Sequence, residues 1–541
     1  MKKIFIPLLL LVPLTLFSQE YSRKDSLRGS ITVEREWWDL LHYEMDITVD
    51  IEKKSISGKN SISYKVLDEM SVLHLDLQDP MKIKSITQDG EFLVYKKEYS
   101  AYFVKLVKPQ RPGSVEEIEV VFEGIPPESS NPPWDGGFVW RKDKNKNPFI
   151  ANANQLIGSS SWFPSKDIPY DEPDNGVRFK ITVPSTLTAV ANGRLIKEEK
   201  TDQSISFTWE VVNPINGYGI NMNIADYVHF SETYAGEKGE LDLDYYVLSY
   251  NLKKAKKQFK QVPKMLEAFE YWFGPYPFYE DSFKLVETPY LGMEHQSSVT
   301  YGNKYENGYL GGDLSLTGQG LKFDFIIIHE SGHEWFANSL TNFDVADMWI
   351  HEGFTTYSEV LYLDYHFGTE AGNEYLIGFR DRITNNSPVT GIYKVNQRGS
   401  GDMYPKGAAM IHTLRQVIDD DEKFRSLLRD INKDFYHQTL SSKQLESYIM
   451  DKTSLELRGF FDQYLKTTDV PMLQCKIKNG EMSYRFKNTV DNFNIPVKMK
   501  IDNKEIWIRP RKEWQKYTLP QPDSKVNMDP NFYIDFNKVK A

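Results

Sequence analysis

Runs of alternating hydrophobic and polar residues dominate the chain as far as residue 235. Between Tyr43 and Asp50 every second residue is apolar, and the residues in between are polar. This period of two is typical of a strand with one buried face and one solvated face. Segments rich in glycine, proline and aspartate separate further runs of this kind. We predict an antiparallel β domain at residues 20–235, with a long loop at residues 126–146.

A helical period begins near Leu252. Apolar residues recur every three or four positions from there to Phe273, which predicts one helix with a kink at Pro263. Helical patterns continue through most of the sequence that follows. We therefore predict a mainly helical domain at residues 236–470.

Strand-like alternation returns after residue 470. Asn479-Gly480 lies between two alternating runs, which is a strong signal for a β-hairpin. We predict a small β-sandwich at residues 471–541. The whole chain then has a multidomain α+β architecture.

The first residues have the pattern of an export signal. Met1-Lys2-Lys3 is basic, and an almost unbroken apolar run of residues 4–17 follows before the chain turns polar. Because this run is too short to span a bilayer comfortably, we predict a signal peptide at residues 1–19 and a periplasmic or extracellular protein. A retained membrane anchor is the alternative. After removal of the signal we expect no stable membrane insertion.

Composition restricts the partners and the cofactor chemistry. The formal net charge is -11 at pH 7 and there is no basic stripe, which argues against nucleic acid as a partner. Cys475 is the only cysteine, so the chain has no internal disulfide and cannot build a thiolate metal site. The composition does not decide the oligomeric state.

The segment His329-Glu330-Ser331-Gly332-His333 indicates a metal site. Residues four apart share one face of a helix, so both imidazoles can bind one ion. Glu330 is offset around the helix and can activate a water on that ion without being a ligand. Apolar residues on both sides of the motif indicate a buried helix, where such side chains are costly unless a cation pairs with them. We predict one zinc ion per chain.

Glu352 is the candidate for the third protein ligand that a catalytic zinc requires. Eighteen residues separate it from His333, enough for one helix to end and a second helix to begin. Glu359 lies seven positions further on, about two turns along the same face. Its carboxylate can accept a hydrogen bond from the second nitrogen of a ligand histidine. His351 is left out of the metal shell because adjacent helical residues point in different directions.

With these motifs the chain resembles the zinc aminopeptidases related to aminopeptidase N and leukotriene hydrolase, a group of gluzincins. The spacing of His333, Glu352 and Glu359 is that of the family, and the resemblance extends from the β domain to Pro471. It implies a thermolysin-like catalytic domain and peptide substrates with a free amino terminus. Many relatives carry a further helical domain that caps the site. We expect no helical cap domain here, and therefore a more open cleft.

Gly292-Met293-Glu294-His295 resembles the Gly-Met-Glu-Asn motif of this family. The resemblance implies that Glu294 binds the α-ammonium group of the substrate, with Gly292 and Met293 beside it. A carboxylate at a fixed distance from the metal measures the gap between an ammonium group and the first peptide carbonyl. His295 stands where the family usually has asparagine.

The resemblance implies two further site residues. Tyr404, in Tyr404-Pro405-Lys406-Gly407, matches a tyrosine that donates its phenol to the oxyanion of the tetrahedral intermediate. Gln155 matches a glutamine that helps to bind the substrate amine.

We therefore expect a zinc-dependent aminopeptidase, a hydrolase that cleaves the amino-terminal peptide bond while Glu330 activates the attacking water. Two alternatives stay open: a zinc endopeptidase that uses the same site, and a noncatalytic peptide-binding protein on this scaffold. Against the second, the general base, the three ligands and the phenol donor are all present. The sequence does not indicate which amino-terminal residue is preferred.

Overall fold

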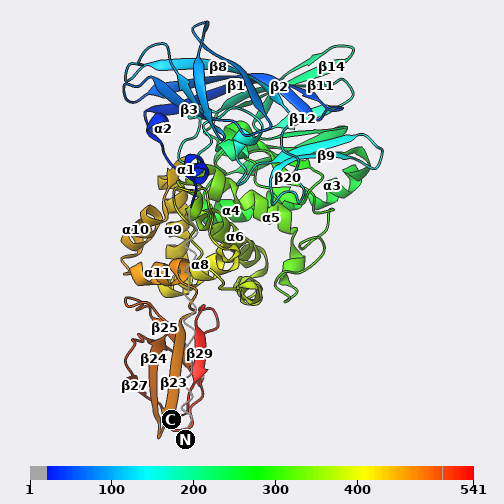
Figure 1. Ribbon diagram of the computed structural model, residues 1–541. Coiled ribbons are helices and arrows are strands. Elements are labelled where there is room, and N and C mark those ends of the chain that lie inside the picture. The colour runs from blue at the N-terminus through cyan, green and yellow to red at the C-terminus, as the bar shows by residue number, and fades with distance from the viewer. Residues whose placement is uncertain (1–20, 503, 541) are drawn as a thin grey trace, which may run out of the picture.

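The computed structural model describes residues 21–502 and 504–540, so the predicted signal peptide at residues 1–19 lies outside the described residues. Figure 1 shows three parts in chain order: a β-rich part in blue and cyan, a helical part in green and yellow, and a small β part in orange and red. This is the predicted multidomain α+β architecture. Among the described residues, none of the helices combines the length and the apolar character that a bilayer crossing requires.

An eight-stranded sheet forms the body of the N-terminal domain, in the order β13-β14-β11-β1-β2-β8-β4-β5. Its strands are β1 (Trp38–Asp50), β2 (Ser55–Val66), β4 (Lys82–Gln88), β5 (Glu91–Phe92), β8 (Val115–Gly124), β11 (Val177–Pro184), β13 (Arg194–Lys200) and β14 (Ser204–Val211). Tyr43, Met45, Ile47 and Val49 of β1 are all buried, as the alternation predicts. The pairings are antiparallel except that β1 runs parallel to β11.

Two smaller sheets and two short helices complete this domain. They are built from α1 (Arg23–Gly29), α2 (Val33–Glu36), β3 (Val72–Asp76), β6 (Val94–Glu98), β7 (Ala101–Lys105), β9 (Gly137–Lys142), β10 (Pro148–Ala153), β12 (Thr188–Ala191) and β15 (Met222–Ala225). The sheet orders are β3-β7-β6 and β12-β15-β10-β9. The predicted loop at residues 126–146 is wrong in its second half, because β9 pairs with β10 along its whole length. The glycines and prolines before this short strand conceal it in the sequence.

A five-stranded sheet opens the central domain, in the order β16-β17-β18-β20-β19. Its strands are β16 (Tyr227–Gly236), β17 (Gly239–Leu248), β18 (Phe283–Glu287), β19 (Gly292–Met293) and β20 (Val299–Tyr301). β16 and β17 form a hairpin, so the sheet of this domain begins at Tyr227. The hairpin spans the predicted domain boundary between residues 235 and 236.

The helix predicted from Leu252 to Phe273 is two helices, α3 (Leu252–Gln258) and α4 (Gln261–Phe273). The break lies at residues 259–260, so the prediction of a kink at Pro263 is wrong by one turn. The proline ring collides with the carbonyl of the residue four positions earlier in a continuous helix, which is Phe259. Within the first turn of α4 the same proline is tolerated, because the N–H that it lacks has no partner there.

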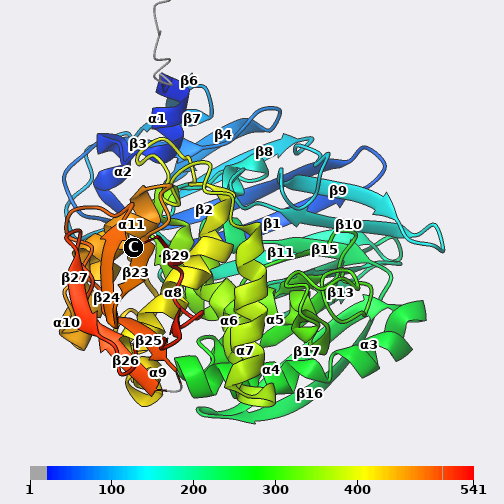
Figure 2. The same cartoon turned by 90° about the horizontal axis from the view of Figure 1, so that it is seen from below.

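Helices make up most of the remaining central domain. They are α5 (Phe325–Gly332), α6 (Trp349–Phe367), α7 (Thr369–Phe379), α8 (Pro405–Ile418), α9 (Asp421–Asp434), α10 (Ser442–Thr453) and α11 (Arg458–Lys466), with the short parallel pair β21 (Leu340–Asn342) and β22 (Gln438–Leu440). Every residue of α6 from Trp349 to Leu363 is buried. Figure 2 shows α6 in the middle of this domain, beside α5, α7 and α8. A helix buried on all sides gives the metal-site candidates on α6 a rigid support.

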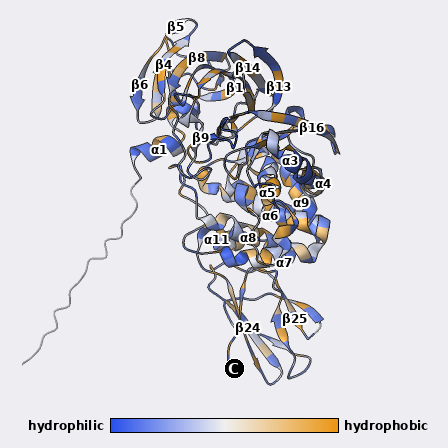
Figure 3. Cartoon of the chain, turned by 90° about the vertical axis from the view of Figure 1, so that its right-hand side faces the viewer, coloured by the Kyte–Doolittle hydropathy of each residue, from blue (hydrophilic) through white to orange (hydrophobic). Residues whose placement is uncertain are grey.

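The C-terminal domain is a sandwich of two sheets, ordered β27-β24-β23-β29 and β26-β25-β28. Its strands are β23 (Met472–Lys478), β24 (Glu481–Lys487), β25 (Val497–Ile501), β26 (Lys504–Ile508), β27 (Gln515–Thr518), β28 (Val526–Met528) and β29 (Asp535–Lys538). Asn479 and Gly480 join β23 to β24 with φ of 51° and 75°, as the predicted hairpin requires. Figure 3 shows both hydrophilic and hydrophobic residues on β24 and β25.

Candidate metal centre

Helix α5 presents the two histidines of the predicted motif. Its N-cap, Asp324, accepts hydrogen bonds from two backbone N–H groups of the first turn, which fixes where the helix begins. α5 ends at Gly332, and His333 follows as the C-cap with helical backbone angles. His329 and His333 are both buried and lie one turn apart on one face.

The second ring nitrogen of each histidine is held by a neighbour. His329 Nδ1 donates to Glu359 Oε1 at 2.7 Å, and His333 Nδ1 donates to the carbonyl oxygen of Phe336 at 3.0 Å. Tyr375 donates its hydroxyl to the other oxygen of Glu359. These bonds favour the tautomer in which Nε2 of each ring carries the free lone pair.

Glu352, in the first turn of α6, completes the group. Its Oε2 lies 3.7 Å from His329 Nε2 and 3.3 Å from His333 Nε2. One ligand atom from each of the three residues lies within 4.8 Å of the others, and all three residues are buried. Glu352 Oε2 has no hydrogen-bond partner among the described residues. Two imidazoles and a carboxylate are a donor set of a catalytic zinc site, so the residues present fit a zinc ion.

Two more buried carboxylates adjoin this group. Glu294 and Glu330 each place an oxygen atom within 4.8 Å of the other and of a ring nitrogen of His333. Burial raises the pKa of both carboxyls, that of Glu330 to about 7. Gly292 lets β19 approach α5 this closely, because a Cβ there would stand 2.7 Å from Ile326 Cγ2. Buried carboxylates gathered in this way need a compensating cation.

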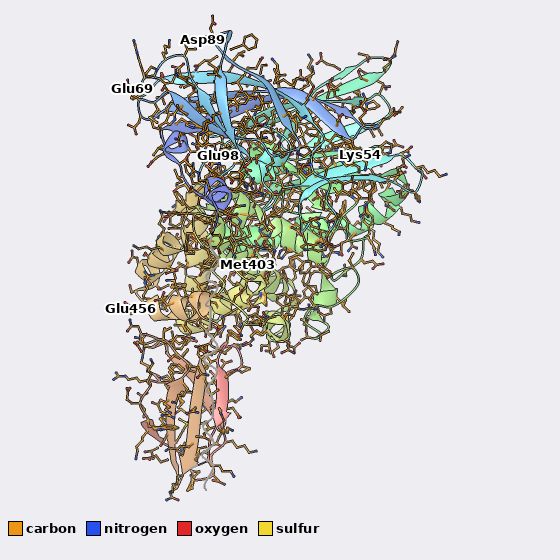
Figure 4. All side chains as sticks on the ribbon, viewed as in Figure 1. Lys54, Glu69, Asp89, Glu98, Met403 and Glu456 are labelled. Carbon is orange, nitrogen blue, oxygen red and sulfur yellow. The ribbon has the colours of Figure 1, made fainter. Side chains whose placement is uncertain are left out.

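Gln155 and Tyr404 reach the same place from other segments. Gln155 Nε2 donates to Glu294 Oε1 at 2.7 Å and to Glu352 Oε1 at 3.2 Å. The Tyr404 hydroxyl donates to the same Glu352 oxygen at 2.9 Å. Met403, labelled in Figure 4, is buried in the central domain immediately before Tyr404. The predicted site residues therefore meet at one position, where the N-terminal domain faces β19, α5, α6 and the start of α8.

Three residues that the sequence did not single out also contact the site. The Tyr218 hydroxyl is buried beside Glu294 without a hydrogen-bond partner among the described residues, and burial raises its pKa well above the ordinary value. Asn338 Nδ2 donates to the backbone carbonyl of Glu294 at 2.9 Å. Thr355 Oγ1 lies 3.0 Å from His333 Nδ1. Thr355 lies one turn after the predicted ligand on α6, which is a usable signal in the sequence, whereas Tyr218 carries none.

His295 and His351 lie outside the metal group. His351 Nε2 accepts a hydrogen bond from the backbone N–H of Asn342 at 2.8 Å. His295 is fully buried, and neither of its ring nitrogens has a partner among the described residues. Burial lowers the pKa of both rings to about 3, so both are neutral near pH 7. His295 thus replaces asparagine in the motif without adding a charge beside Glu294.

Two family models match the chain. The Peptidase M1 N-terminal domain matches residues 40–218, and the Peptidase family M1 domain matches residues 257–464. Human aminopeptidase B is 25% identical over 62% of this chain and 52% of its own length. Leukotriene A-4 hydrolase of Xenopus laevis is 22% identical over 82% of this chain and 73% of its own length. The chain thus spans about half the length of the first of these relatives.

Solved structures of the same family share the fold. The M1 zinc metallopeptidase of Deinococcus radiodurans superposes with a TM-score of 0.68 at 19% identity, over 82% of this chain and 97% of that chain. A mutant of that protein bound to a Tyr-Ser-Ala substrate gives a TM-score of 0.67 at 19% identity, over 81% of this chain and 97% of that chain.

Proposed function

The chain belongs to peptidase family M1, and from this premise we propose that it is a zinc-dependent aminopeptidase that removes the amino-terminal residue of peptides. The two family models together match more than half of the chain. The donor set of His329, His333 and Glu352 fits the zinc cofactor of the family.

The position of Glu294 carries the proposal. Its carboxylate is buried, adjoins Glu330 and His333, and is held by Gln155. A fixed negative charge beside a metal site binds the ammonium group of a substrate and so places the first peptide bond at the metal. An endopeptidase has no use for this charge, because its substrates continue past the site as uncharged amides.

Different residues of the chain carry out the separate steps of the proposed reaction. When bound, a zinc ion polarises the scissile carbonyl and makes water a stronger acid. Glu330 accepts a proton from the attacking water and passes it to the leaving amine. The Tyr404 hydroxyl, which donates to Glu352 in the structure, turns to the carbonyl oxygen as negative charge develops there. Glu294 and Gln155 hold the substrate ammonium throughout.

The proposal is tested with aminoacyl fluorogenic substrates and their N-acetylated forms. We expect cleavage of the free-amine substrates only, loss of activity with a chelator, and recovery with zinc. Glu330→Gln should keep its zinc and lose kcat by about 10²–10⁴-fold, because it removes the general base. Glu69→Gln, an exposed position in the N-terminal domain, is the matched control and should behave as the wild type.

The outcomes separate the alternatives. Cleavage of acetylated substrates at the rate of free ones would establish an endopeptidase instead. Zinc binding and peptide binding without any turnover would establish a binding protein. A Glu330→Gln variant with wild-type kcat would remove Glu330 from the mechanism.

We also propose export with removal of the leader. Expression with the leader in a host with an export pathway, followed by amino-terminal sequencing, should give a mature protein that begins near residue 20. A protein that stays in the cytoplasm with its leader intact would overturn this.

A further inference from the structure

An arginine in the N-terminal helix α1 holds the loop that carries Gln155. Arg28 Nη2 donates to the carbonyl oxygens of Ile157 at 2.8 Å and of Leu156 at 3.3 Å. Its Nη1 donates to Asp167 Oδ2 at 3.0 Å and to Ser160 Oγ at 3.1 Å. The Arg28 side chain is only 12% exposed. One guanidinium group therefore ties residues 156 and 157 to a second segment at residues 160 and 167.

This loop, residues 154–158, is irregular and needs such support. Leu156 has φ of +64°, a conformation that side chains other than glycine seldom adopt. The loop lies outside the regular strands, so its carbonyl groups have no ladder of backbone partners. Apart from Arg28, the described side chains that donate to the carbonyl oxygens of Leu156 and Ile157 are Asn396, to Leu156 at 3.4 Å, and Gln78, to Ile157.

Helix α1 is itself fixed at both ends. Arg35 Nη1 donates to the carbonyl oxygens of Leu27 at 2.7 Å and Ser30 at 2.9 Å. The Nη2 atom of the same guanidinium group pairs with the buried Asp76. A capping box between Ser22 and residue 25 closes the first turn. The helix is therefore a rigid platform for Arg28.

The same helix touches the central domain. A Cβ at Gly29 would stand 2.1 Å from the backbone nitrogen of Asn396, so the two backbones pack directly together. Tyr21 donates to Gln397, the next residue of that segment. Figure 1 shows α1 where the β-rich part meets the helical part. The segment at residues 396–397 continues along the chain to Tyr404.

We propose that residues 21–30 are a clamp that positions Gln155 for the substrate amine, with Arg28 as its positioning residue. The inference rests on the proposed aminopeptidase function. Arg28 does not touch the site: it acts through the backbone of residues 156 and 157, which directly follow Gln155. Loosening this loop weakens the hold of Gln155 on Glu294, and so weakens ammonium binding, while Glu330 and the metal ligands stay in place.

Arg28→Ala should therefore raise KM for free-amine substrates about tenfold and change kcat by less than about twofold, because hydrogen bonds to a charged group are lost at the loop. Arg28→Lys keeps the charge but not the forked donors, so its KM should lie between those of the wild type and Arg28→Ala. Arg23→Ala is the matched control. Arg23 is on the same helix, its side chain is 54% exposed, and it pairs with the partly exposed Glu98, which Figure 4 labels.

A double-mutant cycle decides whether Arg28 acts through Gln155. In a Gln155→Ala background, Arg28→Ala should raise KM by less than about twofold, since the group that it positions is gone. An unchanged tenfold effect in that background would overturn the proposal. So would an Arg28→Ala variant with a lower melting temperature but wild-type KM, because the role would then be structural only.

Hydrogen exchange tests the clamp without any activity assay. The backbone N–H groups of Ile157 and Gly158 bond within the loop, to Gln155 O and Asn154 O, both at 2.8 Å. In Arg28→Ala their exchange should accelerate at least about tenfold, while α5 and α6 exchange as in the wild type. Unchanged exchange at these amides overturns the clamp. A wild-type protein that cleaves no aminoacyl substrate, with accelerated exchange in the variant, instead overturns the proposed function and leaves the clamp standing.

Discussion

Replacing Glu172 with glutamine tests how the N-terminal and central domains are joined. Glu172 is buried in the N-terminal domain, and its Oε1 lies 2.7 Å from the hydroxyl of Thr341 in the central domain. That hydroxyl also lies 2.6 Å from the carbonyl oxygen of Ala337. A hydroxyl has one proton and cannot donate to both. A protonated Glu172 resolves the conflict, because its own O–H donates to Thr341 while Thr341 donates to Ala337.

The electrostatics point the same way. Burial raises the pKa of the Glu172 carboxyl to about 8 from an ordinary value of 4.5. The folded protein therefore keeps a proton that the unfolded chain releases, so this group's contribution to stability is complete below pH 4.5 and is lost as the pH rises through about 8. At about 1.4 kcal/mol per pKa unit, the loss is about 5 kcal/mol at pH 9 and about 1 kcal/mol at pH 5. A glutamine amide donates to Thr341 in the same way and stays neutral throughout.

Melting temperatures of the wild type and Glu172→Gln, measured with saturating zinc at pH 5, 7 and 9, give the comparison. We expect the variant to be more stable by an amount that widens with pH to several degrees or more at pH 9. Glu69→Gln removes an exposed carboxyl from the same domain and should show no such widening. A difference that stays constant from pH 5 to pH 9, or a variant less stable than the wild type at pH 9, would show that burial does not keep Glu172 protonated below about pH 8 and would refute the reasoning.

Three further substitutions have defined outcomes. Glu359→Gln should weaken zinc binding by about 10–100-fold, because it replaces the acceptor of His329 Nδ1, and competition with a chromophoric chelator measures this; an unchanged Kd would contradict it. Tyr404→Phe should lower kcat by about 10²–10³-fold with little change in KM, and a variant that loses only KM would assign the phenol to substrate binding. Gly407→Ala should lower the free energy of unfolding by about 1–3 kcal/mol and reduce kcat. The added Cβ would stand 2.9 Å from Gly353 Cα and push α8 away from α6. A wild-type melting temperature would contradict this close contact.

The sequence predicted the parts of the site that helical spacing determines. His329 on α5 and His333 at its C-cap are four positions apart, and Glu352 and Glu359 lie two turns apart on α6. The structure brings these side chains together. The helix boundary before Pro263 was missed because the steric effect of a proline falls on the preceding turn. β9 was missed because it is defined by its partner β10 and not by its own pattern.

Sequence patterns could not predict the contacts between segments that lie far apart along the chain. Arg28 meets Ile157 across 129 positions, and nothing local marks either residue. Glu172 meets Thr341, which lies 169 positions later. Tyr218 approaches Glu294 only because the two domains close on each other. Such contacts follow from the packed domains and not from any periodicity.

Under the proposed function, the placement of the two domains would set the distance from the substrate amine to the metal. Asn216 of the N-terminal domain donates to Asn338 Oδ1 at 3.0 Å, and Asn338 donates to the backbone carbonyl of Glu294 at 2.9 Å. Gln155, also in the N-terminal domain, donates from Nε2 to Oε1 of Glu294 at 2.7 Å. The metal-ligand candidates and Glu330, in contrast, all lie in the central domain. His329 and Glu330 are on α5, His333 is its C-cap, and Glu352 is on α6. Loosening the domain interface at Asn216 should thus impair ammonium binding, and with it KM, before it impairs the hydrolytic step.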